Sequence, residues 1–374
     1  MDLSVISTYR CNSHCSMCSI WKSPTLPTEE VSLATLQKLP GGFDNLNITG
    51  GEPTLRNDLK EIVDLLHPKA KKLEISSNGM YPDRLEAIVK KYPDIKIRFS
   101  LDGFDLTNNR VRGEKDGFNI KTKGLKRLQE LGGEDLGFAI TIQDDNVSDL
   151  VGLYQMAEEN HFELATSALH NGFQFHKSDN LPYDRPRVAR EIQGLITAQL
   201  RTWNVKNWFR AYLNLGLIKK VLGQDRLIPC TAATDFMFID PWSDVYACNV
   251  RPDLKVGNLE QQSWEEIYAG QQAQAIRNKV AQCTQNCWMV GSARTAMRNP
   301  RFTSLPKIGP AAWVIENKIR VTLGGKIPFE RYVDYGRVHR DSNVTRRTYY
   351  LDHPVKRIVE ARAQPHYQEN YSNR

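Results

Sequence analysis

Residues 11–18 read Cys11-Asn12-Ser13-His14-Cys15-Ser16-Met17-Cys18 and directly follow a short apolar run at 3–7. Three cysteines at the spacing C-x3-C-x2-C place three thiolates on one tight loop. Iron–sulfur clusters are held by cysteine thiolates, normally four for a [4Fe–4S] cluster. Three thiolates would therefore leave one iron free to bind a substrate or cofactor. Close cysteines also occur in zinc loops, so this motif by itself leaves both metals open.

A second motif, Gly50-Gly51-Glu52-Pro53, stands about thirty residues after Cys18 and follows a strand-like run at 45–49. The two motifs together resemble the radical S-adenosylmethionine (SAM) superfamily. The resemblance implies an oxidoreductase-like enzyme in which Cys11, Cys15 and Cys18 hold a [4Fe–4S] cluster and the open iron chelates SAM. One-electron reduction then yields a 5′-deoxyadenosyl radical, which takes hydrogen from carbon.

The first 170 residues alternate between strand and helix patterns. Strand-like runs lie at 3–7, 45–49, 72–77, 96–101, 136–142 and 162–168, and helical patterns lie at 28–39, 57–66, 81–91, 117–131 and 147–160. This alternation predicts an α/β fold with a parallel sheet and covering helices. The resemblance narrows the prediction to a partial (β/α)6 radical SAM barrel, with chemistry at the carboxyl ends of the strands. With trailing helices at about 180–222, the first domain is expected to span 1–222. Four aromatic residues in those helices are expected to pack in a core: Trp203, Trp208, Phe209 and Tyr212.

The resemblance also implies which residues contact SAM. Met17 stands where the family usually has an aromatic residue near the adenine, and a flexible thioether can pack there. Gly50, Gly51, Glu52 and Pro53 match the motif that binds the methionyl amino group, although Glu52 is expected to orient this loop rather than to touch the chemistry.

Two further strand ends carry polar residues. Ser77 and Asn78 follow the third strand and resemble a SAM-contacting turn, although Asn-Gly is also an ordinary turn sequence. Ser100 ends the fourth strand and is expected to contact SAM. Arg112, further along, would pair with the SAM carboxylate through its guanidinium fork. The alternative for Arg112 is a solvated position in a charged loop.

The remaining cysteines form a second group, Cys230, Cys248, Cys283 and Cys287, so that all seven cysteines fall into a set of three and a set of four. Four thiolates could hold zinc or a second [4Fe–4S] cluster, and spacing alone leaves both open. The segment 240–248, together with 256–259 and Trp264, resembles the SPASM/twitch auxiliary domain. That resemblance implies one auxiliary cluster in a small α+β domain at 223–292. Asn249 stands where sulfatase-maturing relatives have a catalytic Asp, so no catalytic base is assigned.

Charge is unevenly distributed. Residues 291–374 hold 16 Lys and Arg against 7 Asp and Glu and so carry +9, whereas the preceding 290 residues carry −2. This predicts a basic C-terminal extension at 293–374, either a solvated surface or a contact with an anionic partner. No aromatic-interleaved nucleic-acid motif is present, so no nucleic-acid partner is expected. The absence of a long apolar stretch and of a signal peptide predicts a cytoplasmic enzyme without a transmembrane segment.

No motif in the sequence identifies the substrate class directly. The barrel pattern starts at residue 3, without a leader-binding domain before it, and this favours a small molecule such as a sugar or nucleotide sugar. Oxidation or epimerisation aided by the auxiliary cluster is expected, with flavodoxin or ferredoxin as reductant. The alternative is a maturase that modifies a peptide or protein side chain. A metal-binding scaffold without catalysis is the remaining possibility.

Overall fold

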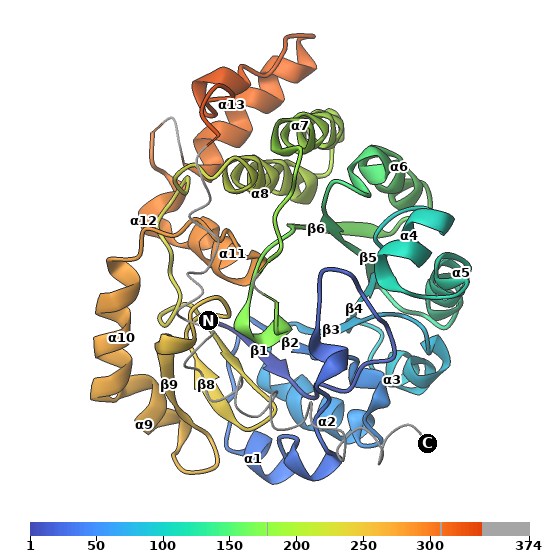
Figure 1. Ribbon diagram of the computed structural model, residues 1–374, viewed down its shortest axis with the longest axis vertical. Coiled ribbons are helices and arrows are strands. Elements are labelled where there is room, and N and C mark those ends of the chain that lie inside the picture. Colours follow the sequence, from blue (N-terminus) through green and yellow to red (C-terminus); the bar gives the residue numbers. More distant parts are fainter. Residues whose placement is uncertain (178, 307–308, 339–374) are drawn as a thin grey trace.

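The computed structural model describes residues 1–177, 179–306 and 309–338. Within them one curved sheet runs through the molecule in the order β6-β5-β4-β3-β2-β1-β7-β8-β9 (Figure 1). The first six strands are parallel and form the predicted partial barrel: β1 (Asp2–Ile6), β2 (Asn45–Thr49), β3 (Leu73–Ser77), β4 (Lys96–Ser100), β5 (Asp135–Ile142) and β6 (Glu163–Ala168). Their aliphatic and aromatic side chains are buried in the main core, as expected for a sheet covered by helices.

Helices cover the outer side of these strands (Figure 1). They are α1 (Leu33–Gln37), α2 (Leu59–Leu66), α3 (Glu86–Lys91), α4 (Asp105–Arg112), α5 (Gly117–Glu130) and α6 (Leu150–Glu159). The sequence predicted this set except α4. That helix reads Asp-Leu-Thr-Asn-Asn-Arg-Val-Arg, in which apolar residues do not recur with a helical period, so its helicity was not visible.

Two long helices, α7 (Arg185–Arg201) and α8 (Val205–Val221), follow the barrel and pack against each other. Tyr212 is fully buried, whereas Trp203 is 78% exposed in the connection between the two helices. The expectation that Trp203 packs in the core is therefore wrong. Its ring instead lies under the ammonium group of Lys318, 4.2 Å from the ring centroid.

The second cysteine region extends the barrel sheet instead of building its own. Strand β7 (Phe236–Ile239) pairs in parallel with β1, and β8 (Asp244–Tyr246) and β9 (Lys255–Asn258) continue the sheet as antiparallel strands. Two helices follow, α9 (Trp264–Ala269) and α10 (Gln271–Ala281). The break falls at Gly270, whose extended backbone ends the first helix and begins the second.

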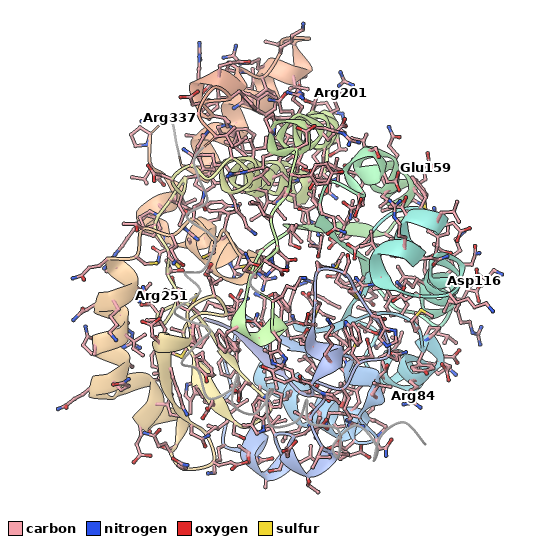
Figure 2. The ribbon with its side chains drawn as sticks, in the orientation of Figure 1. Arg84, Asp116, Glu159, Arg201, Arg251 and Arg337 are labelled. Atoms are coloured by element: carbon pink, nitrogen blue, oxygen red, sulfur yellow. The ribbon has the colours of Figure 1, made fainter. Side chains whose placement is uncertain are left out.

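The described part of the basic extension is helical: α11 (Val290–Arg298), α12 (Pro300–Thr303) and α13 (Pro310–Thr322). Helix α13 packs on α7 and α8 through Trp313 and Val314, which are buried, while Ile315 on its other side is exposed. Figure 2 draws the side chains of the described residues and labels Arg337 near their C-terminal end. Lys307, Arg340, Arg346 and Arg347 lie outside the described residues. Among the described helices, none is long and apolar enough to cross a membrane.

Candidate active site

The loop that carries Cys11, Cys15 and Cys18 leaves the carboxyl end of β1 and is held by a buried carboxylate. Glu30 accepts hydrogen bonds from Arg10 at 2.7 and 2.8 Å and from Thr25 at 2.9 Å. The Thr25 hydroxyl in turn accepts from the backbone N–H of Tyr9 at 3.0 Å. These bonds fix the start of the cysteine loop. Glu30 belongs to no recognisable motif, so its sequence context does not reveal this role.

The two glycines of the second motif pack against this loop. The N–H of Gly51 donates to the carbonyl of Thr8 at 2.7 Å. A Cβ on Gly50 would lie 2.6 Å from the Thr8 carbonyl oxygen, and one on Gly51 would lie 2.3 Å from that of Arg10. Glycine is therefore required here because backbone meets backbone.

Glu52 is fully buried and organises the neighbouring strand end. Its carboxylate accepts hydrogen bonds from the Ser77 hydroxyl at 2.9 Å, the Asn78 N–H at 2.5 Å and the Thr54 N–H at 2.9 Å. Burial raises the pKa of this carboxyl group. Glu52 and the buried Pro53 are not among the residues that line the cavity described next, so the structure places both behind the site rather than in it.

A cavity of about 190 Å³ opens at the carboxyl ends of the barrel strands. It brings together residues from the cysteine loop and from the ends of β2, β3 and β4 that the sequence singled out: Cys11, Cys15, Cys18, Met17, Gly50, Gly51, Ser77, Asn78, Ser100 and Arg112. The amide of Asn78 also donates to Asn12 within the cysteine loop at 2.6 Å. The site residues therefore converge from separate strand ends, as expected for a barrel of this type.

Arg112 lines this cavity but already has carboxylate partners. It donates to Asp102 at 2.6 Å and to Glu114 at 3.3 Å, and Glu114 also pairs with the buried Lys121. Burial lowers the pKa of Lys121 to about 8. Arg112 is thus neither solvated nor free, and its guanidinium belongs to a buried, charge-balanced group beside Cys15.

Three aromatic side chains complete the cavity wall, and the sequence analysis did not single them out. Trp21 donates its indole N–H to the Cys18 carbonyl at 3.0 Å, while His170 and Phe175 come from the segment after β6. Asn180 ties this segment to the cysteine loop, since its amide donates to the carbonyls of Met17 and His170 at 2.9 Å each. His170 and Phe175 directly follow the last barrel strand, and this position could have indicated that they belong to the site.

His170 is held as a neutral imidazole. Burial lowers its pKa to about 3. Its Nδ1 lies 3.1 Å from the Ala168 carbonyl oxygen, so the neutral ring donates from Nδ1 and keeps a lone pair on Nε2. Arg112 is therefore the one charged side chain among the described residues that line this cavity, the cysteine thiols aside.

The three loop cysteines are poor acids in the protein without metal. Burial raises the pKa of Cys11 to about 12 and that of Cys18 to about 11, and it also raises the pKa of Cys15. A metal ligated here must therefore displace these protons. The thiols share one cavity, and the polar and glycine-lined side facing them leaves room for a cofactor, so the residues fit a cluster with an open position.

The other four cysteines also come together. A hydrogen bond between Cys248 and Cys287 raises the pKa of the first thiol and lowers that of the second, and Cys230 lies near Cys287 and Cys283. Arg226 lies 3.9 Å from the Cys287 sulfur, and the Val250 N–H donates to the Cys248 sulfur at 3.3 Å. Across the described chain no group of three or more His, Cys, Asp or Glu side chains is arranged around a single-ion position.

Comparison with known families decides between zinc and iron–sulfur chemistry. The model of the radical SAM superfamily matches residues 5–157, and that of an iron–sulfur cluster-binding domain, SPASM, matches residues 230–288. The chain carries a radical SAM domain followed by a SPASM domain. The radical SAM domain implies SAM and a SAM-binding [4Fe–4S] cluster, and the SPASM domain implies auxiliary iron–sulfur.

Curated relatives of this radical SAM protein differ in what they make. It is 33% identical to Fe-coproporphyrin III synthase of Methanosarcina barkeri over 160 residues (41% of this chain, 39% of the relative). It is 30% identical to the sporulation killing factor maturation protein SkfB of Bacillus subtilis over 152 residues (38% and 37%). Identity to the mycofactocin maturase MftC of Mycolicibacterium smegmatis is 26% over 249 residues (64% and 62%). The matches to the first two relatives span about two fifths of their lengths.

Among solved structures, native anSMEcpe with bound AdoMet and Cp18Cys peptide has a similar fold. The TM-score is 0.57 at 13% identity, over 87% of this chain and 97% of that one. The similarity therefore extends beyond the barrel to the SPASM domain, and it confirms the predicted fold class.

Proposed function

We propose that this radical SAM enzyme is a SPASM-type maturase that takes a hydrogen atom from a side chain of a peptide or protein. Two of the relatives above carry the name of a maturase or maturation protein, and the structure of similar fold holds a peptide. The small-molecule substrate favoured by the sequence analysis is less well supported than this alternative.

The electrostatics of the cavity carry the proposal. A nucleotide sugar would need cationic side chains to bind its diphosphate. The described lining offers Arg112 alone, and that guanidinium is already engaged by Asp102 and Glu114. The rest of the wall is uncharged: hydroxyl and amide groups line the side of the strand ends, and the other side carries the apolar and aromatic groups of Met17, Ile20, Trp21, Leu169 and Phe175. Such a wall suits an uncharged side chain better than a phosphorylated metabolite.

The protein's own residues hold and shield the reaction. When bound, the cluster and SAM supply a radical strong enough to remove hydrogen from an unactivated carbon. Cys11, Cys15 and Cys18 would ligate the cluster, and Ser77, Asn78, Ser100 and Arg112 would contact SAM at the ends of β3 and β4 and from α4. Trp21 and Phe175 would exclude water from the reacting carbon, which protects a reactive intermediate.

The auxiliary site lies next to the segment that follows β6. A Cβ on Gly172 would lie 3.1 Å from the Asn249 carbonyl oxygen, next to Cys248. We propose that Cys230, Cys248, Cys283 and Cys287 hold one auxiliary cluster that passes electrons during turnover, with a flavodoxin or ferredoxin as external reductant.

Deuterium transfer distinguishes the two substrate classes. The reconstituted enzyme is reduced with dithionite in the presence of extracts from deuterated cells of the source organism, separated by size and treated or not with protease. The proposal predicts that one fraction transfers deuterium into 5′-deoxyadenosine and that treatment of this fraction with protease abolishes the transfer. Deuterium transfer from a protease-resistant small-molecule fraction would instead establish the small-molecule reading. The variant with Cys11, Cys15 and Cys18 all changed to Ala controls for label that arises without SAM cleavage.

A further inference from the structure

A second and larger cavity, of about 510 Å³, lies at the opposite ends of the barrel strands. Glu74 of β3, Lys96 and Arg98 of β4 and Ala165 of β6 line one side, and helices α8 and α11 line the other. Lys96 is the first residue of its strand, whereas the SAM-contact candidate Ser100 is the last. These two residues are four steps apart, or roughly 13 Å along the strand, so the Lys96 end of this second cavity lies well away from the reacting atoms.

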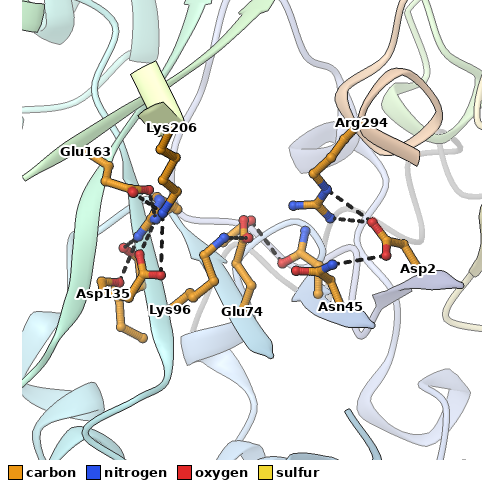
Figure 3. A network of polar contacts seen from close by, with 12 residues as sticks. Asp2, Asn45, Glu74, Lys96, Asp135, Glu163, Lys206 and Arg294 are labelled. Atoms are coloured by element: carbon orange, nitrogen blue, oxygen red, sulfur yellow. Dashed lines mark hydrogen bonds and ion pairs between the residues drawn. The ribbon is translucent and has the colours of Figure 1, made fainter. Parts of the chain in front are cut away.

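A network of charged side chains, in three separate ion-paired groups, surrounds this cavity (Figure 3). On one side Glu163 accepts from Arg210 at 2.5 Å and also pairs with Lys206 and Arg98. On the other side Asp2 accepts from Arg294 at 2.9 Å and from Arg298 at 2.7 Å. Between them Lys96 pairs with Glu74 at 2.9 Å. Figure 3 shows Lys206 with Glu163 and Asp135 on one side, Arg294 with Asp2 on the other, and the Lys96–Glu74 pair between them.

Cations outnumber carboxylates in this network. Six basic side chains (Lys96, Arg98, Lys206, Arg210, Arg294 and Arg298) stand with four acidic ones (Asp2, Glu74, Asp135 and Glu163). Nearby Lys and Arg lower the pKa of Glu74 to about 2 despite its burial, and they lower that of Glu163 further, so these carboxylates remain ionised at neutral pH. An excess of positive charge therefore remains at a cavity mouth where water is partly excluded. Such an excess favours an anion.

The inner wall of the same cavity is apolar. Phe209 and Leu213 project from α8, and Val290 and Met297 from α11. The side chains of Lys206 and Arg298 are each 48% exposed, so their charges lie at the opening rather than in the interior. The volume lies within the range of about 300–1,000 Å³ that is usual for ligand pockets.

We propose that this cavity binds an amphipathic anion, with an apolar chain or ring between α8 and α11 and a carboxylate or phosphate head between Lys206 and Arg298. Such a ligand would join the barrel, through α8, to the helix that directly follows the auxiliary cysteines. It would stabilise the relative position of the two iron–sulfur regions and would not be a substrate, because it lies at the wrong ends of the strands. This site is independent of the proposed maturase activity.

Three probes with the same ten-carbon chain test the chemistry of the head: decanoate, decyl phosphate and decanol. Calorimetric titration of the reconstituted enzyme should give one-to-one saturable binding of at least one anion, and thermal melting should shift upward with its concentration. The more tightly bound anion identifies the head group. Decanol should bind at least about tenfold more weakly, which corresponds to about 1.4 kcal/mol. Failure of both anions to bind, or equal binding of decanol, would overturn the proposal.

Two variants locate the binding. Lys206→Gln with Arg298→Gln removes two mouth cations, while Glu163 keeps Arg98 and Arg210 and Asp2 keeps Arg294, so the fold should survive. Anion affinity should fall about tenfold or more, and decanol binding should not change. Lys90→Gln with Arg127→Gln, two exposed cations elsewhere, is the matched control and should bind as wild type. Leu213→Trp should fill the cavity and abolish binding of all three probes; unchanged binding in this variant would also refute the site.

Discussion

A single buried carboxylate, Glu52, shows how the residue scale determines the active site. It matches a cofactor motif by sequence, yet its oxygens are occupied by donors from Thr54, Ser77 and Asn78. Its role in the structure is to hold the end of β3 against the second motif. The glycines beside it are required for the same reason, since they admit the backbone of the cysteine loop.

Replacing Glu52 with Gln tests this positioning role. The amide NH2 would face N–H and O–H donors, and unsatisfied buried groups cost about 1–3 kcal/mol each. We expect thermal stability to fall and the Kd for SAM to rise about tenfold, because Ser77 and Asn78 lose their anchor. Equilibrium dialysis with labelled SAM measures the affinity. Glu61→Gln on the exposed side of α2 is the control. A normal SAM affinity in E52Q would show that the anchor is dispensable.

Asp240 provides a pH-dependent prediction. Burial raises the pKa of this carboxyl to about 8, while its Oδ1 accepts from the N–H groups of Trp242 and Asp244. The unfolded chain loses this proton near pH 3.8 and the folded chain near pH 8, so the folded state is progressively destabilised as pH rises between these values.

Asp240→Asn should remove this loss of stability at rising pH. The variant keeps an oxygen acceptor but carries no charge, so it should be more stable than wild type at about pH 8, by about 1–3 kcal/mol, and nearly equal at about pH 4. Thermal melts across this range measure the difference. A gap between the two proteins that does not depend on pH would mean that Asp240 does not hold a proton in the folded state.

At the scale of elements, α4 supports the cysteine loop. The N–H groups of His14 and Ser16 donate to the carbonyls of Arg112 and Val111 at the end of this helix. The helix ends at Gly113, whose backbone is left-handed with φ of 60°. Helix α4 therefore brings both a cavity residue and two backbone acceptors to the metal-binding loop.

Gly113→Ala should disturb that loop. The added Cβ would lie 2.8 Å from the His14 carbonyl oxygen, so the cysteine loop would shift and iron content should fall by up to about four atoms per chain. Gly132→Ala is the matched control, because its φ is 98° but nothing lies within 4 Å of its Cβ position. Both variants should lose about 1 kcal/mol through backbone strain, but only G113A should lose iron. Iron analysis and thermal melts separate the two effects, and equal iron in both variants would exclude the loop shift.

At the scale of the whole molecule, the auxiliary region is built onto the barrel. Strand β7 pairs with β1, and Trp288, next to Cys287, donates its indole N–H to the Leu213 carbonyl of α8 at 2.8 Å. A Cβ on Gly216 of α8 would lie 1.9 Å from the Trp288 ring. The two cysteine groups are therefore parts of one packed structure. Because these contacts involve no cysteine thiol, they should persist when one cluster is lost.

Removal of the auxiliary ligands tests this independence. The anaerobically reconstituted enzyme should hold about eight irons, and Cys248→Ala with Cys287→Ala should leave about four. SAM binding should persist because the loop cysteines are intact, whereas product formation should stop. Metal analysis and SAM binding measure the two results. Stoichiometric zinc with about four irons in the wild type would contradict a second iron–sulfur cluster.

The sequence by itself determined the family chemistry and the order of strands and helices. Both depend on local patterns of neighbouring residues. These patterns are the three cysteines on one loop, the two glycines after a strand and the regular β-α alternation. The bounds predicted for β2 coincide with those in the structure, whereas α4 was missed because it lacks apolar periodicity. The orienting role of Glu52 was expected from the sequence. The carboxylate partners of Arg112, the entry of His170 and Phe175 into the cavity, and the ion pairs around the second cavity were decided only by the tertiary structure. Each depends on which distant side chains meet, and packing and charge pairing between separate elements set those contacts.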